Sequence, residues 1–190
     1  MKVSGNAIVL TNGKFDTKSA KTAHGLIRGS KRFIIKSVID DKFHAKYVHS
    51  NKYGNVFMSS IKSKIPVFKN VESFLEAGID VNYCIIGVAS AGGILPEEMR
   101  NDVILALNNN ISIVNGLHSI LNYDSQLKKI AEDKNVKIYD VRVSKSRDQL
   151  NFWSGKIYDV KSSKIVVLGT DCGLGKRTTA KLVVEALEKN

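Results

Sequence analysis

The residues best suited to chemistry in this 190-residue chain form a glycine-rich run near its end, Leu168-Gly-Thr-Asp-Cys-Gly-Leu-Gly-Lys-Arg-Thr-Thr179. The apolar stretch before the run predicts a short strand over residues 164–168, and apolar residues at helical spacing after it predict a helix. Backbone N–H groups of such a loop, the dipole of the following helix and the ammonium of Lys176 can all face one anion. The run therefore predicts a phosphate-binding loop.

This loop differs in two ways from the most common phosphate-binding pattern. Five residues separate Gly169 from Gly175 instead of four, and Arg177 stands where a Ser or Thr would bind magnesium. These differences disfavour metal-assisted ATP hydrolysis, and we predict no metal ligands. An ordinary strand–turn–helix corner is the structural alternative. The predicted phosphate-binding residues are Gly169, Thr170, Gly173, Gly175, Lys176, Arg177, Thr178 and Thr179.

Apolar strands alternate with helical segments over most of the chain, and this alternation is typical of parallel βαβ units. The sequence predicts an α/β fold with a Rossmann-like, mostly parallel sheet flanked by helices. We expect a basic loop with a short helix over residues 42–63. The expected strands are 7–11, 33–39, 65–68, 83–89, 111–114 and 137–141, and the expected helices are 18–28, 71–77, one that starts at Pro96, and 125–134.

The domain organisation predicted from this pattern has three parts. Residues 1–143 form the Rossmann-like domain, residues 144–163 a polar linker, and residues 164–190 the first strand and helix of a P-loop domain. A P-loop domain needs several more strands than one. We therefore expect the chain to be the front part of a longer protein.

Ligands of a Rossmann-like sheet bind beyond the carboxyl ends of its strands, where the strand order switches. Two predicted loops meet there, residues 12–19 and residues 90–96, and neither carries G-x-G-x-x-G. The second loop contains Gly92 and Gly93, whose N–H groups could face a ligand. Asp40 ends the second strand, as either a substrate-binding acid at this rim or, the reading that we favour, a solvated turn residue.

One histidine is a candidate general base. His118 follows the fifth predicted strand beside a glycine, which places it at the ligand-binding edge. A hydrogen-bonded rim residue is the alternative. His24 falls on the apolar face of the first helix, and we expect it to belong to the core.

Composition limits the remaining possibilities. The chain is 43% hydrophobic, carries a net charge of +11 and has two cysteines, too few for a disulfide framework. No apolar run is long enough to span a membrane and no signal peptide is recognisable, so we expect a cytoplasmic protein. The charge favours anionic small molecules. We expect a small-molecule substrate, no specific nucleic acid and no membrane partner, and we leave a homo-oligomer open.

Five local signatures occur in one order: Lys21-Thr-Ala-His-Gly-Leu-Ile-Arg-Gly29, Ile86-Gly-Val-Ala-Ser-Ala-Gly-Gly93, Asn115-Gly-Leu-His118, Phe152-Trp-Ser-Gly155 and the glycine-rich run. Together they resemble the D-glutamate N-acetyltransferase family, also known as domain of unknown function 1611. The resemblance covers essentially the whole chain. It implies a Rossmann-like N-terminal domain joined to a P-loop domain, and acetyl transfer from acetyl-CoA to the amine of D-glutamate in some members.

Residue chemistry is compatible with that activity. A glycine–lysine loop without the magnesium-binding hydroxyl suits the pyrophosphate of coenzyme A, and Arg177 can bind phosphate through its planar guanidinium. We assign the general-base role to His118, and we expect the N–H groups of Gly92 and Gly93 to stabilise the thioester oxyanion. Two alternatives stay open: a ligase or kinase of the dethiobiotin-synthetase type that uses ATP with magnesium, and a non-catalytic nucleotide-binding module.

Overall fold

The computed structural model describes residues 3–51, 55–171 and 174–189. The chain divides into two compact units, Met1–Ser144 and Lys145–Asn190.

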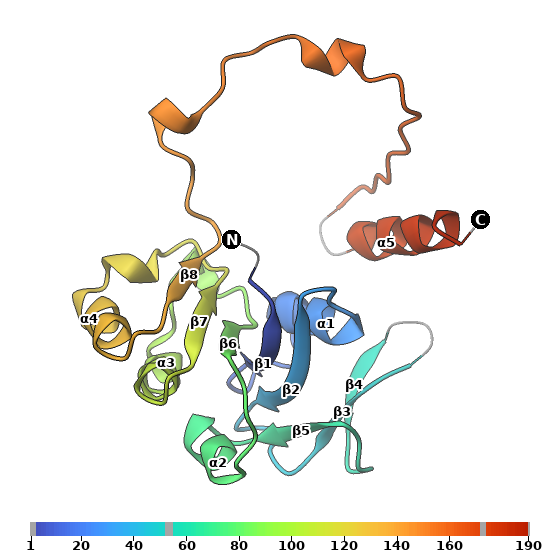
Figure 1. The fold of residues 1–190 in the computed structure, drawn as a ribbon. Coiled ribbons are helices and arrows are strands. Elements are labelled where there is room, and N and C mark those ends of the chain that lie inside the picture. The colour runs from blue at the N-terminus through green and yellow to red at the C-terminus, as the bar shows by residue number, and fades with distance from the viewer. Residues whose placement is uncertain (1–2, 52–54, 172–173, 190) are drawn as a thin grey trace. The chain divides into compact units, whose positions relative to one another are not determined.

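The first unit is built on an eight-stranded sheet with the order β4-β3-β5-β2-β1-β6-β7-β8 (Figure 1). The six strands from β5 to β8 in this order are parallel, whereas β3 is antiparallel to both β4 and β5. The six parallel strands have the Rossmann order, with its switch between β1 and β6. The strands are β1 (Gly5–Leu10), β2 (Phe33–Ile39), β3 (Tyr47–Ser50), β4 (Val56–Ser59), β5 (Ile65–Phe68), β6 (Tyr83–Ile86), β7 (Ser112–Asn115) and β8 (Ile138–Asp140).

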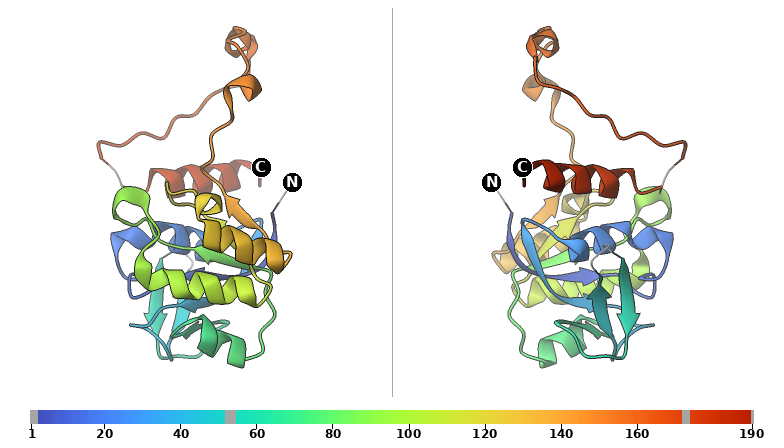
Figure 2. Two further views of the ribbon diagram at one scale, coloured as in Figure 1. Left: turned by 90° about the vertical axis from the view of Figure 1, so that its left-hand side faces the viewer. Right: turned by 90° about the vertical axis from the view of Figure 1, so that its right-hand side faces the viewer.

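Alternating residues of the central strand β1 enter two different cores, as the two-residue repeat of a strand requires. Ile8 and Leu10 belong to a large cluster that includes buried side chains of α2, α3 and α4. Ala7 and Val9 belong to a smaller cluster that includes Ala23 of α1. The sheet is therefore covered by helices on both faces, with α3 and α4 side by side on one of them (Figure 2). These helices are α1 (Lys21–Arg28), α2 (Val71–Glu76), α3 (Glu97–Asn108) and α4 (Ser125–Asp133).

Local capping residues explain where three of these helices begin. The Asn70 side chain accepts a hydrogen bond from the Ser73 N–H at the start of α2. Pro96 precedes α3, and two glutamates occupy its first turn, where the helix dipole favours negative charge. The Asp124 carboxylate accepts hydrogen bonds from two N–H groups in the first turn of α4. The predicted mixed α/β fold with a mostly parallel sheet is confirmed.

The segment from Lys42 to Ser63 differs from the prediction of a loop with a short helix. It contains the antiparallel hairpin β3–β4, in which His49 pairs with Phe57 and the two rings stack with centroids 5.6 Å apart. Val48 is buried in a third cluster with Phe15 and residues of β2 and β5. Strands of four residues are too short to show a clear alternation, and tertiary packing stabilises this hairpin.

The second unit contains one long helix, α5 (Lys176–Leu187), as predicted. The predicted strand over residues 164–168 is not formed, and the side chains of Ile165, Val166 and Leu168 are exposed. A strand is held by hydrogen bonds to a neighbouring strand, and the described residues of this unit include no other strand. Two short 3-10 turns, Arg147–Gln149 and Lys156–Asp159, precede this segment.

Candidate functional site

The carboxyl ends of β6, β7 and β8 bring three loop segments together. Gly93, in the loop after β6, has a positive φ of 67° and contacts His118, in the loop after β7. A Cβ atom on Gly93 would lie 2.5 Å from His118 Cδ2 and 2.7 Å from His118 Cβ. The Ser119 N–H donates to the Gly93 carbonyl at 2.9 Å. Only glycine therefore allows the two loops to approach this closely.

Two polar residues at strand ends hold the His118 loop in place. Asn115, at the end of β7, is fully buried and donates through Nδ2 to Asp140 Oδ1 at 2.6 Å and to the Ser119 carbonyl at 2.7 Å. Its Oδ1 accepts the Leu117 N–H at 2.9 Å. Asp140, at the end of β8, also accepts hydrogen bonds from the backbone N–H groups of Leu121 and Asn122. The backbone that carries His118 is thus fixed from both sides.

The His118 side chain is exposed and touches one cation. Arg142, two residues beyond β8, lies with its Nη1 3.2 Å from His118 Nε2. The Nε of the same guanidinium donates to the Gly116 carbonyl at 2.6 Å. Arg142 was not predicted, because it follows a short strand and lies 24 residues from its partner. Its position just beyond the predicted strand 137–141, at the ligand-binding edge, is the signal in the sequence that could have indicated it.

Gly92 and Gly93 differ in what their N–H groups can do. The Gly93 N–H donates to the Ser90 carbonyl at 3.0 Å, so the prediction that it serves as an oxyanion donor is wrong for this conformation. The N–H of Gly92 has no hydrogen-bond partner in the part of the chain that the structure describes, and Gly92 is exposed. Of the two glycines, Gly92 alone offers a donor to a ligand.

Asp40 is neither a solvated turn residue nor an open rim acid. Its side chain is fully buried at the end of β2. Oδ2 accepts the Thr11 hydroxyl at 2.7 Å and the Phe15 N–H at 3.3 Å, and Oδ1 accepts the N–H groups of Lys42 and Phe43, both at 3.1 Å. The prediction is corrected, because these four donors occupy the carboxylate. Asp40 anchors the two loops that follow β1 and β2.

His24 is half-buried on α1, as expected of a core histidine. Its Nε2 lies 2.8 Å from the Phe15 carbonyl, and the ring packs edge-on against the Phe15 ring at 4.8 Å. Burial is the main cause that lowers the pKa of His24 below its ordinary value. The neutral imidazole of His24 therefore stabilises the loop that follows β1.

A hollow of about 340 Å³ lies at the carboxyl end of β1, beside α2 and α3. Four carboxylates line it, against the single ammonium of Lys69. The pKa of Glu98 is lowered, first by its own backbone N–H and then by Lys14, whose Nζ is 3.0 Å away. An anionic hollow of this kind disfavours phosphate groups. The carboxylates are those of Asp41, Glu72, Glu98 and Asp102.

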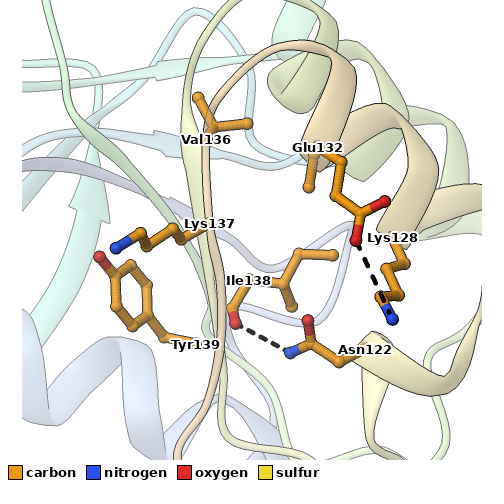
Figure 3. A pocket seen from close by; sticks show the side chains of 8 residues that line it. Asn122, Lys128, Glu132, Val136, Lys137, Ile138 and Tyr139 are labelled. Atoms are coloured by element: carbon orange, nitrogen blue, oxygen red, sulfur yellow. Dashed lines mark hydrogen bonds and ion pairs between the residues drawn. The ribbon is translucent and has the colours of Figure 1, made fainter.

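A second hollow, of about 270 Å³, lies between α4 and β8 (Figure 3). Lys128 and Glu132 form an ion pair of 3.9 Å at this hollow, and Asn122 Nδ2 donates to the Ile138 carbonyl at 2.9 Å. None of the predicted site residues lines this hollow. Of the charged side chains that line it, Lys128 and Glu132 pair with each other.

The glycine–lysine loop lies in the second unit. Gly175 has a φ of 87° and directly precedes α5. The Lys176 side chain folds back over the loop, since its ammonium donates to the Asp171 carbonyl and a Cβ on Gly169 would lie 3.2 Å from Lys176 Cδ. The Thr179 N–H donates to the Gly175 carbonyl at 2.9 Å within the helix. The predicted residue Gly173 lies outside the described residues.

Of the other predicted residues, Thr170 lies in the loop before α5, and Arg177 and Thr178 lie in the first turn of that helix. The N-terminus of α5 follows this loop, and the first N–H groups of a helix have no partners inside the helix itself. No group of three or more His, Cys, Asp or Glu side chains that could hold a metal ion occurs within residues 3–51, 55–171 and 174–189. Over the same ranges, no helix is both long enough and apolar enough to cross a membrane.

The strand order, the ligand edge and the glycine–lysine loop define an α/β protein with a Rossmann-like domain followed by the start of a P-loop domain. Two family models match this arrangement, the Rossmann-like domain DUF1611_N over residues 49–144 and the P-loop domain DUF1611 over residues 151–190. The chain belongs to the DUF1611 family. The resemblance found in the sequence is thereby confirmed.

Curated relatives and a solved structure agree with this membership. A D-glutamate N-acetyltransferase of Pseudoalteromonas sp. is 29% identical over 105 residues, which are 55% of this chain and 30% of that protein. A second, of Tritonibacter scottomollicae, is 29% identical over 96 residues, 50% of this chain and 28% of that protein. The crystal structure of a DUF1611 family protein from Anabaena variabilis matches 97% of this chain with a TM-score of 0.79 and 26% identity, and the match covers 50% of that chain. The matched region thus covers less than a third of the length of each of these two curated relatives.

Proposed function

We propose that this chain contributes the Rossmann-like domain and the beginning of the P-loop domain to an enzyme that N-acetylates an acidic D-amino acid, D-glutamate or a close analogue, with acetyl-CoA. The observation that carries the proposal is the similarity to two proteins named D-glutamate N-acetyltransferase. At the family level these relatives support an acetyltransferase-type function. The proposal extends this class to a specific acceptor, acetyl donor and set of residue roles.

The glycine–lysine loop is the proposed binding site for the pyrophosphate of coenzyme A. Gly175 leads into α5 in a conformation that favours glycine, and the Lys176 ammonium is held inside the loop by a carbonyl that an anion could replace. Arg177 has no hydroxyl with which to bind magnesium, and its guanidinium can bind phosphate without a metal. Acetyl-CoA, when bound, supplies the acetyl thioester.

His118 is the proposed base of the transfer. The reaction forms an N–C bond and breaks a C–S bond, so the acceptor ammonium must lose two protons, of which the leaving thiolate gains one and water takes the other. An imidazole at the carboxyl edge of β7 can take the first proton and return it to the sulfur. The exposed N–H of Gly92 is a donor suited to the oxygen of the thioester carbonyl.

An acetylation assay with acetyl-CoA and D-glutamate tests this proposal, run on the 190-residue chain and on the full product of its gene in parallel. Replacing His118 with alanine should lower turnover by about 10²- to 10⁴-fold, the usual worth of a general base. Binding of coenzyme A, measured by calorimetry, should not change. His49→Ala in the β3–β4 hairpin is the matched control and should keep full turnover.

Two results would contradict the proposal. Tight, magnesium-dependent ATP binding without affinity for coenzyme A would favour the ligase or kinase alternative. Tight nucleotide binding without turnover of any acidic D-amino acid would favour a non-catalytic nucleotide-binding module. Full activity of His118→Ala would remove the assigned base and leave the acetyltransferase class intact.

A further inference from the structure

The guanidinium of Arg142 makes two contacts with its own neighbourhood and has no acidic partner among the described residues. Its Nε donates to the Gly116 carbonyl and its Nη1 contacts His118 Nε2, so two of its five N–H groups are engaged. None of the carboxylates within the described residues pairs with it. The acid nearest in sequence, Asp140, is already occupied by Asn115, Asn122 and backbone N–H groups. Three N–H groups of Arg142 therefore remain for a ligand.

The contact between Arg142 and His118 has a defined direction. Arginine is always a donor, because it has no acceptor atom and keeps its proton at any physiological pH. His118 Nε2 must then be the acceptor, which places the proton of the neutral ring on Nδ1. The lone pair that a general base would use is thus occupied by Arg142 in this conformation.

We propose that Arg142 binds a carboxylate of the acceptor substrate, and that the same guanidinium covers the His118 Nε2 lone pair until the carboxylate binds. A carboxylate can engage two parallel N–H groups of one guanidinium, which neither a carbonyl nor an imidazole can do. Reorientation of Arg142 toward this stronger acceptor uncovers Nε2 beside the substrate. The role of His118 as the base rests on the function proposed above, whereas carboxylate binding by Arg142 does not.

Two features of the site favour a carboxylate of a small acceptor. Arg142 and His118 are both exposed at the carboxyl edge of the sheet, where ligands of this fold bind. The exposed Gly92 N–H belongs to the same loop as Gly93, which touches His118. An acid whose amine lies a few atoms from its carboxylate could bind Arg142 and present the amine to His118.

Nuclear magnetic resonance of the ¹⁵N-labelled 190-residue protein tests the inference without any need for turnover. At about pH 8, where an ordinary histidine is neutral, long-range ¹H–¹⁵N spectra should show His118 with Nδ1 protonated and Nε2 unprotonated. Titration with D-glutamate or glutarate should shift the His118 signals, whereas butylamine, which has no carboxylate, should not. His118→Gln identifies the signals.

Variants of Arg142 give the second measurement. Arg142→Met should weaken D-glutamate binding by about 10- to 100-fold, the usual effect of losing a charge-assisted hydrogen bond, and should release the fixed tautomer of His118. Arg142→Lys keeps the charge but lacks the planar guanidinium, and its affinity for D-glutamate should lie between those of the unaltered protein and Arg142→Met. Arg32→Met removes the same charge before β2, at the opposite edge of the sheet, and should leave both readouts unchanged.

The inference is overturned if His118 carries its proton on Nε2 in the unaltered protein, or if Arg142→Met binds D-glutamate as tightly as the unaltered protein does. It is also overturned if coenzyme A shifts the His118 signals through Arg142 and D-glutamate does not, because the site would then bind phosphate. Carboxylate binding through Arg142 without acetylation would leave this inference standing and refute the proposed function. Acetylation that survives Arg142→Met unchanged would do the reverse.

Discussion

Replacing Gly93 with alanine should disturb the candidate site more than the same change at Gly92. Both residues have nearly equal positive φ angles, 67° and 65°, so both alanines would adopt a left-handed conformation that costs roughly 1–2 kcal/mol. The two sites differ in their surroundings. A Cβ on Gly92 would meet the Ile94 side chain at 3.6 Å, which is ordinary contact, whereas a Cβ on Gly93 would lie 2.5 Å from His118 Cδ2.

The overlap at Gly93 cannot be relieved by a side-chain rotation alone. The new Cβ would also lie 2.7 Å from His118 Cβ, an atom fixed to a loop that Asn115 and Asp140 hold in place. Overpacking of this kind typically costs about 1–3 kcal/mol. We therefore expect Gly93→Ala to lose roughly 1–3 kcal/mol more of the free energy of unfolding than Gly92→Ala.

Urea unfolding followed by circular dichroism measures this difference. Fluorescence is unsuitable, because the single tryptophan, Trp153, belongs to the second unit and not to the unit that holds Gly93. Equal unfolding free energies for the two variants, within about 0.5 kcal/mol, would refute the reasoning. So would a Gly93→Ala protein whose His118 resonances are unchanged.

Three further predictions concern other parts of the molecule. Asp40→Ala should destabilise the protein by about 3 kcal/mol or more, because it leaves four donors without an acceptor. The exposed control Asp41→Ala should change the unfolding free energy by about 0.5 kcal/mol at most. Similar unfolding free energies for the two variants would show that Asp40 is not an anchor. The lowered pKa of His24 means that its contribution to stability is present above about pH 6.5, its ordinary pKa, and is lost as the pH falls through the folded-state value. Urea midpoints measured from about pH 7.5 to pH 5 should therefore fall more steeply in the unaltered protein than in His24→Gln, and parallel curves would contradict this. In the second unit, Lys176→Ala should weaken coenzyme A binding by about 10- to 100-fold in calorimetry, whereas Lys181→Ala, on the same helix, should not. Unchanged coenzyme A binding by Lys176→Ala would show that the loop is an ordinary strand–turn–helix corner.

Local signals in the sequence located most of the helices and the parallel strands. The capping residues Asn70 and Asp124, and Pro96 before two glutamates, act within one turn of the helix that they start. Buried parallel strands are continuous apolar runs, which the sequence displays directly. The β3–β4 hairpin has neither signal, since it is held by packing against Phe15, Val38 and Val67, residues that lie outside the hairpin.

The same distinction applies to the candidate site. The sequence by itself determined which edge of the sheet carries His118 and Gly93, because parallel strands in the Rossmann order place their carboxyl ends together. It also determined the glycine–lysine loop, whose residues are contiguous. Only the tertiary structure decided that Asp40 is buried under four donors and that Arg142 covers His118 Nε2. Two of the four Asp40 donors, Thr11 and Phe15, and the Arg142 partner of His118 lie 24 or more positions away along the chain. Their placement depends on the register and twist of neighbouring strands, and no local pattern of residues encodes it.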